Sequence, residues 1–191
     1  MLEKKYTQAF KKILTNPGFA YFKLKKIISS IIKSPFNFLF FKKFGRFSYI
    51  SYHASIINKP KITVGSFVEI NRGCCIWPLS LDIANGVQIN PNTVIYGVVS
   101  IGENTMIGPN CNIIGGNHNF ANTHVPMKYQ GSTEKGIKIG NDVWIGAGVT
   151  ILDGVTIGSG SIIGAGSIVT KDLPPFSISV GNPIRIIKIR T

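Results

Sequence analysis

The sequence predicts an all-β protein built as a parallel β-helix, with a short basic segment before it and one long loop extruded from it. Three observations support this: aliphatic side chains recur every six residues, glycine often follows them, and the repeat is interrupted once. A helix turns by about 100° per residue, so six-residue spacing would not keep these side chains on one helical face. Short strands joined by tight turns would. Three such hexads form one triangular coil, and coils stack as parallel strands about 4.8 Å apart.

The repeat begins at Val64 and ends at Val169. Its aliphatic positions, all Ile or Val and all expected to point inward, are Val64, Ile70, Ile76, Ile83, Ile89, Ile95, Ile101, Ile107, Ile113, Ile139, Ile145, Ile151, Ile157, Ile163 and Val169. The glycine that often comes next is expected to relieve the turn of a Cβ. Four residues after each aliphatic lies a small or β-branched residue. Cys74 and Cys111 occupy this position, so we expect them to be buried packing residues.

Two breaks interrupt the register. Ile76 and Ile83 are seven residues apart, a slip that a bulge or corner absorbs. Ile113 and Ile139 are 26 apart, and the residues between them lack the pattern. Residues 115–138 are therefore predicted to leave the coil as a loop, and a loop this long inside a compact domain is usually functional or disordered. Residues 175–191 form a C-terminal tail.

Charge divides the chain near residue 50. Of the 21 Lys and Arg and 8 acidic residues, residues 1–50 hold eleven bases and one acid, together with nine of the twelve Phe. Such a segment suits an anionic membrane, nucleic acid or an acidic partner, or helices packed on the body. We predict that residues 1–50 are mainly helical and cap the open end of a domain spanning 51–191. Weak peripheral membrane contact is a secondary role, and no nucleic acid partner is expected.

The chain is expected to be cytoplasmic, or peripheral to the inner face of the membrane. No apolar stretch approaches the roughly 20 residues of a membrane-spanning helix, and no secretory signal is recognisable. The three cysteines cannot all pair with one another, which suits a reducing compartment. Cys75 has no adjacent base, so a nucleophilic role is not expected.

Several motifs resemble those of the hexapeptide-repeat acyltransferases, a family with a left-handed parallel β-helix that includes galactoside and maltose acetyltransferases. The likeness is strongest to the polysaccharide and lipopolysaccharide O-acetyltransferases. It covers roughly residues 60–190. The motifs are Ile89-Asn90-Pro91-Asn92, Asn117-His118-Asn119-Phe120, Gln130-Gly131, Ile139-Gly140-Asn141-Asp142-Val143-Trp144-Ile145-Gly146, the run 163–172, and the tail from Gly181-Asn182-Pro183 to Arg190.

The resemblance implies acetyl transfer from acetyl-CoA to a sugar hydroxyl, in surface polysaccharide biosynthesis. His118, where the loop leaves the coil, would be the general base, since a neutral imidazole can take the hydroxyl proton. Trp144, Asn90 and Gln88 would contact the acceptor. The expected CoA-binding residues are Ala147, Ala165, Thr170, Lys171, Arg185 and Lys188. His124 is expected to be solvated or to touch substrate, and His53 to be structural.

Relatives in this family are homotrimers with active sites at subunit boundaries, so a homotrimer is expected here. An N-acetyltransferase of an amino sugar or sugar nucleotide is the alternative on the same scaffold. A zinc hydratase related to γ-type carbonic anhydrases would need three converging imidazoles, and the sequence offers no credible third, so no metal is expected. A non-catalytic scaffold would not need the His118 loop.

Overall fold

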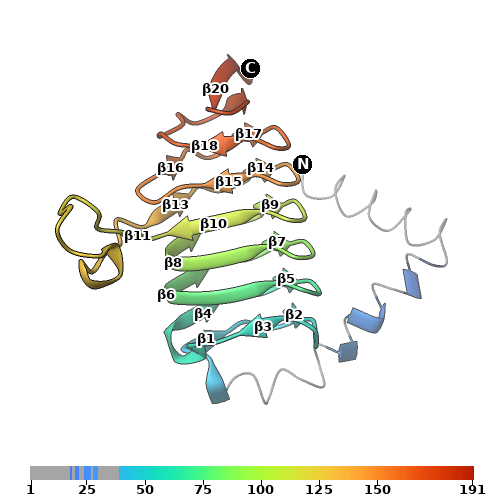
Figure 1. Ribbon diagram of the computed structural model, residues 1–191. Helices are drawn as coiled ribbons and strands as arrows, with labels where there is room; N and C mark the ends of the chain where they lie inside the picture. Colours follow the sequence, from blue (N-terminus) through green and yellow to red (C-terminus); the bar gives the residue numbers. More distant parts are fainter. Residues whose placement is uncertain (1–17, 19, 22–23, 27, 30–38) are drawn as a thin grey trace.

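The protein is a left-handed parallel β-helix whose coils stack into a three-sided prism (Figure 1). The computed structural model describes residues 18, 20–21, 24–26, 28–29 and 39–191. Each coil contributes a strand segment to each of three faces. Equivalent segments of neighbouring coils pair in parallel, except that the last two strands of the second face pair antiparallel. We call the faces first, second and third in chain order, and the corner that follows each face takes the same ordinal.

The strands divide among the faces as follows. The first face contains β1 (Lys43–Phe44), β4 (Ile62–Val64), the ends of β6 (Cys75–Ile83) and β8 (Val94–Ile101), β13 (Ile137–Ile139) and β16 (Thr156–Ile157). The second contains β2 (Tyr49–Ile50), β5 (Glu69–Ile70), β7 (Gln88–Ile89), β9 (Met106–Ile107), β14 (Trp144–Ile145), β17 (Ile162–Ile163), β19 (Ser177–Val180) and β20 (Arg185–Ile189). The third contains β3 (Ser55–Ile56), the starts of β6 and β8, β10 (Asn112–Gly115), β15 (Thr150–Ile151) and β18 (Ile168–Val169).

The hexad aliphatics form the core, as the repeat predicts. On the second face Ile89 pairs with Ile70 on one side and Ile107 on the other, and Ile107 pairs with Ile145. These side chains are at most 1% exposed. Burying one isoleucine contributes about 1.5–3 kcal/mol, so the three columns supply most of the driving force for folding.

The β-helix begins earlier than residue 51. Strands β1, β2 and β3 form a coil below Val64, with Phe44, Ile50 and Ile56 at the hexad positions. Two features hide this coil from the periodicity: an aromatic residue replaces an aliphatic one, and the 3₁₀ turn η1 (Lys59–Lys61) lengthens the step to Val64. The proposed boundary at residue 50 therefore falls inside this first coil.

Glycine is needed after the aliphatic for a different reason from the predicted one. A Cβ on Gly65 would lie 2.6 Å from the carbonyl carbon of Ala84, and one on Gly108 the same distance from that of Gly146. These glycines allow close approach of the next coil. The left-handed turn conformation lies two residues after the glycine, at Phe67 after Gly65, with φ 59°.

The small inward position links consecutive coils through side-chain hydrogen bonds. Thr93 Oγ1 donates to the carbonyl of Gly108 at 3.0 Å. Cys74 and Cys111 donate in the same way through Sγ, to the carbonyls of Asn90 at 3.3 Å and Gly146 at 3.1 Å. Both thiols are buried, as predicted, and burial raises the pKa of each. Cys75 is half-buried.

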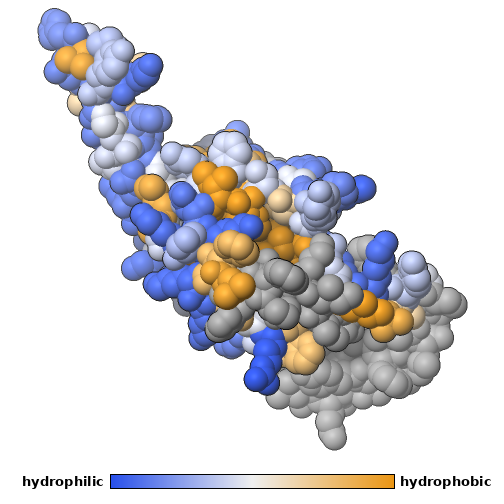
Figure 2. Space-filling view, turned by 90° about the horizontal axis from the view of Figure 1, so that it is seen from below, coloured by the Kyte–Doolittle hydropathy of each residue, from blue (hydrophilic) through white to orange (hydrophobic). Residues whose placement is uncertain are grey.

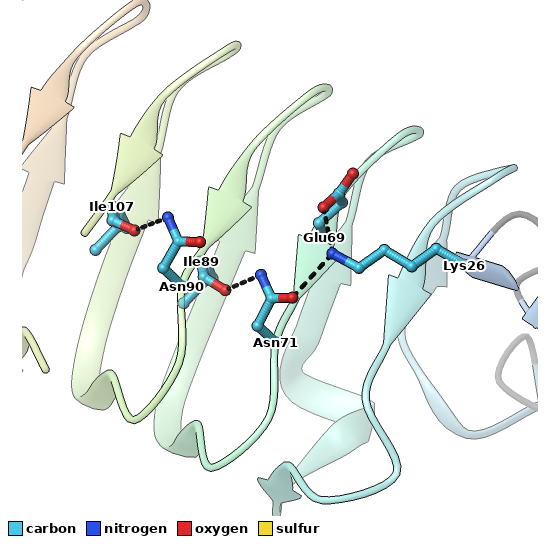
Figure 3. Close-up of polar contacts among 6 residues, drawn as sticks. All are labelled: Lys26, Glu69, Asn71, Ile89, Asn90 and Ile107. Atoms are coloured by element: carbon cyan, nitrogen blue, oxygen red, sulfur yellow. Dashed lines mark hydrogen bonds and ion pairs between the residues drawn. The ribbon is translucent and has the colours of Figure 1, made fainter. Parts of the chain in front are cut away.

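Part of the N-terminal segment is held against the first coils. The described residues at 18, 20–21, 24–26 and 28–29 are helical. Lys26 Nζ donates to Glu69 Oε2 at 2.7 Å and to Asn71 Oδ1 at 2.9 Å (Figure 3). It also lies 5.3 Å from the centre of the Tyr49 ring. Of the predicted cap formed by residues 1–50, residues 1–38 lie mostly outside the described part of the chain. Among those that are described, no helix is long and apolar enough to cross a membrane.

Candidate functional site

The long loop leaves the prism at the third corner, where β10 ends. Two glycines permit this exit. A Cβ on Gly97 would lie 2.0 Å from the carbonyl oxygen of Gly115, and one on Gly115 would lie 2.2 Å from that of Val98. Because backbone meets backbone here, any side chain at either position would displace the start of the loop.

His118 lies in a hairpin at the base of this loop. Strand β11 (Asn117–His118) pairs antiparallel with β12 (Ser132–Thr133), with His118 opposite Ser132. The His118 backbone N–H donates to Asn117 Oδ1 at 2.9 Å, which fixes the main chain at this point. The imidazole itself is exposed to solvent, where a substrate can reach it.

Gln130 organises the outer part of the loop. Its Nε2 donates to the carbonyls of Asn122 at 2.7 Å and Val125 at 2.6 Å, while its Oε1 accepts from the Asn122 N–H at 3.0 Å. Asn119 Nδ2 donates to the Gln130 carbonyl at 3.0 Å. The loop is thus folded on itself through side-chain hydrogen bonds.

Asp153 holds the returning end of the loop and was not predicted from the sequence. Its carboxylate oxygens accept from the N–H groups of Lys135 at 3.1 Å and Gly136 at 2.8 Å, just before β13. The returning backbone has no regular strand partner at that point, so its N–H groups need a side-chain acceptor. An acidic residue in the coil that follows the loop was the sequence signal for such an acceptor. Through these hydrogen bonds, Asp153 and Gln130 both hold the loop in position.

Gln88 and Trp144 point outward from the second face in one row, with Met106 between them. At about 4.8 Å between strands they lie roughly 10 Å apart. Trp144 is 53% exposed, so it is an outward side chain and not a core residue. Asn90 lies beside this row at the second corner, where its Nδ2 donates to the Ile107 carbonyl at 2.8 Å (Figure 3). The acceptor-binding role of Asn90 stays a prediction, beside this observed structural one.

Within one chain, His118 does not lie near these residues. The loop leaves at the third corner, which is opposite the second face, and in Figure 1 β11 and β14 lie on opposite sides of the prism. Gln88, Asn90 and Trp144 therefore lie across the prism from His118 of the same chain.

The six predicted CoA-binding residues also divide between the third corner and the side of the second face, and all six are exposed. Ala147 and Ala165 stack at the second corner, where the Gly166 N–H donates to the Ala147 carbonyl at 2.8 Å. Thr170 and Lys171 follow β18 at the third corner, two strands from the loop exit. Arg185 and Lys188 lie on β20, opposite Val180 and Ile178.

Of the other two histidines, one shares the loop with His118 and one lies in the first coil. His124 is exposed in the loop, with its backbone N–H donating to Asn122 Oδ1 at 2.9 Å. His53 lies in the first coil, its ring 5.5 Å from that of Tyr52. Across the described part of the chain, no three His, Cys, Asp or Glu side chains are grouped so as to hold a metal ion.

Curated proteins similar to this chain include nodulation protein L of Rhizobium meliloti (strain 1021), which is 40% identical over 116 residues. The match covers 59% of this chain and 61% of that protein. A probable acetyltransferase of Mycobacterium tuberculosis is 34% identical over 113 residues, covering 58% of this chain and 38% of its own length. The chain thus spans less than two thirds of the length of these relatives.

Solved structures extend the comparison. The N-acyltransferase AntD from Bacillus cereus, in complex with dTDP-4-amino-4,6-dideoxyglucose and coenzyme A, superposes with a TM-score of 0.75 at 26% identity, covering 83% of this chain and 89% of that one. PerB from Caulobacter crescentus, in complex with CoA and GDP-perosamine, shares the fold at 24% identity, with a TM-score of 0.61 and coverage of 76% and 58%. The family described as bacterial transferase hexapeptide (six repeats) matches residues 82–115 and 136–171, the coils on either side of the loop. In repeat sequence and in fold, the chain is thus similar to the hexapeptide-repeat transferases.

Proposed function

We propose that this protein transfers an acetyl group from acetyl-CoA to a sugar. The observation that carries the proposal is His118, an exposed imidazole at the rigid base of a folded loop on a hexapeptide-repeat scaffold. Both AntD and PerB were solved with coenzyme A, and their second ligands are nucleotide-linked amino sugars. This supports a CoA thioester as donor and a sugar derivative as acceptor.

The active site is proposed to form between subunits of a homotrimer. One chain holds His118, Thr170 and Lys171 at the third corner, and holds Trp144, Gln88, Ala147 and Ala165 on or beside the second face. A neighbour whose second face meets this third corner would complete the site. The loop carries the exposed side chains of Phe120, Met127 and Tyr129, which suit such a contact.

In this arrangement His118 takes a proton from the acceptor as its nucleophilic atom attacks the thioester carbonyl. The carbon–sulfur bond then breaks, and the same imidazole returns the proton to the departing thiolate, so charge and atoms balance. Lys171 of the same corner would neutralise phosphate on the donor. No group of the chain becomes acylated in this scheme.

For the acceptor atom, the solved relatives favour an amine. AntD is an N-acyltransferase whose solved complex includes a 4-amino sugar nucleotide, so N-acetylation of an amino sugar is the better supported reaction. The O-acetylation expected from the sequence remains the second candidate. It rests on the likeness of the His118 loop and the Trp144 coil to polysaccharide O-acetyltransferases.

Acetyl transfer from acetyl-CoA to paired panels of amino and non-amino sugars, free and nucleotide-linked, tests the proposal. His118→Ala is expected to lower turnover by about 10²–10⁴ while acetyl-CoA binding by calorimetry is retained, because the base acts on the acceptor. His124→Ala, in the same loop, is the matched control and should keep near-normal turnover. Unchanged turnover in His118→Ala would remove this residue as the base.

A further inference from the structure

We propose that the N-terminal end of the prism, formed by residues 39–67, docks on an anionic membrane surface. We call this part of the molecule the basal end. It is not part of the proposed active site, and the inference does not depend on the acceptor.

Large apolar side chains point outward at all three corners of the first coil. Phe47, Tyr52 and Ile57 are 50%, 85% and 46% exposed, and Leu39 and Phe40 are exposed just before the coil. Later coils carry smaller or polar residues at the first two of these positions, such as Asn104 and Pro109. Seen from below, apolar side chains gather near the centre of this end, among hydrophilic ones (Figure 2).

The charge of the basal end is entirely positive. Residues 39–67 include Lys42, Lys43, Arg46, Lys59 and Lys61 and contain no acidic residue. Lys59 Nζ lies 5.7 Å from the centre of the Phe40 ring, so cations and aromatic rings are interleaved on this surface. Apolar side chains flanked by Lys and Arg are the combination that binds the headgroup region of anionic bilayers.

Two phenylalanines of the basal end occupy turn positions whose backbone conformation disfavours aromatic residues. Phe47 and Phe67 stack at the first corner, with ring centres 5.4 Å apart, and both have a left-handed backbone with φ 59°. Asn104 holds the same corner position in a later coil, with φ 57°. Asn tolerates this conformation better than an aromatic residue, so Phe is not there for the turn.

Charge also argues for a membrane over a second copy of the chain. Two basal ends facing one another would bring two uniformly positive surfaces together, whereas an anionic lipid surface is complementary. Because the apolar corner side chains belong to a rigid coil, the contact would be shallow, at the level of the headgroups.

The test is flotation of the full-length protein with phosphatidylcholine vesicles, with and without phosphatidylserine. Wild type is expected to float only with the anionic vesicles and to be released by raised salt. Phe47→Asn/Phe67→Asn should lower partitioning about tenfold through loss of apolar contact, without loss of thermal stability. Lys42→Gln/Lys43→Gln/Arg46→Gln should weaken binding to a similar degree.

Phe176→Asn is the matched control. Phe176 occupies the same left-handed corner position at the other end of the prism, with φ 61° and 52% exposure, so this variant should bind as wild type does. The proposal is overturned if wild type does not float with anionic vesicles. It is overturned equally if both basal variants float as wild type does, since binding would then come from another part of the chain. Concentration-dependent dimerisation abolished by the paired Asn variant, without flotation, would assign the surface to a second copy.

Discussion

Two buried thiols occupy hexad positions that Ser and Thr fill elsewhere in the stack. Cys111 donates to the Gly146 carbonyl as Ser48 donates, at 2.7 Å, to the Gly65 carbonyl one coil further on. The thiol adds apolar volume to this link, and burial disfavours its charged form. The two cysteines are therefore structural residues that are sensitive to high pH.

We predict that stability falls as the pH rises above the ordinary thiol value of 9.0, because the pKa values of Cys74 and Cys111 are raised in the folded state. Above that value the unfolded chain loses these protons first, which favours unfolding by up to about 1.4 kcal/mol per pH unit for each thiol. Below it the contribution is fully present. Urea unfolding at several pH values on either side of 9.0 measures the slope.

The comparison variant is Cys74→Ser/Cys111→Ser, which keeps the hydrogen bonds and removes the titration. Its stability should change less with pH over the same range. Equal slopes in the two proteins would show that other groups cause the loss.

At the scale of the elements, the exit of the loop depends on two glycines, Gly97 and Gly115, whose backbones are in close contact at the third corner. We predict that Gly97→Ala destabilises the protein by about 2–4 kcal/mol, since the new Cβ would meet the Gly115 carbonyl oxygen at 2.0 Å and φ is +80°. Gly116→Ala is the matched control, because the nearest atom, Glu134 Cγ, is 3.4 Å away. Chemical denaturation measures both. A similarly small loss of stability in the two variants would mean that the backbone at the loop exit adapts to a side chain at Gly97.

The elements also show which parts of the structure can be predicted from the sequence. Ile and Val at six-residue spacing fix the inward columns, so the coils from Val64 onward and the loop after Ile113 follow directly. The first coil does not, because Phe44 and the turn η1 break both residue type and spacing. The close-approach role of Gly65 needs the neighbouring coil, which no local pattern contains.

The candidate site was predictable as a set of residues but not as an arrangement. The step from Ile113 to Ile139 is not a multiple of six, so the sequence leaves open on which face the coils resume. They resume on the first face, where Ile139 pairs with Ile101. Only this placement shows that His118 and Trp144 are on opposite sides of one chain.

At the scale of the whole molecule, this separation predicts complementation between inactive variants. His118→Ala and Trp144→Ala alter opposite sides of the prism. If each site joins the third corner of one subunit to the second face of the next, co-expressed and co-purified mixtures will contain intact sites. Random assembly in equal amounts gives about one quarter of them, so about a quarter of wild-type activity should return.

Each variant assayed alone, and a mixture of separately purified and unexchanged trimers, serve as the baseline. Activity that never rises above this baseline would place both residues in a site within one subunit or remove Trp144 from the site.

The coils on either side of the loop stack as though the loop were absent. Ile139 continues the column of Ile101, and Ile151 continues that of Ile113. The segment between them therefore leaves the strand register of the prism unchanged. It is tied to the prism by the close backbone approach at Gly97 and Gly115 and by the Asp153 hydrogen bonds. Outside the His118 hairpin, such an insertion can change in length and sequence while the scaffold stays constant.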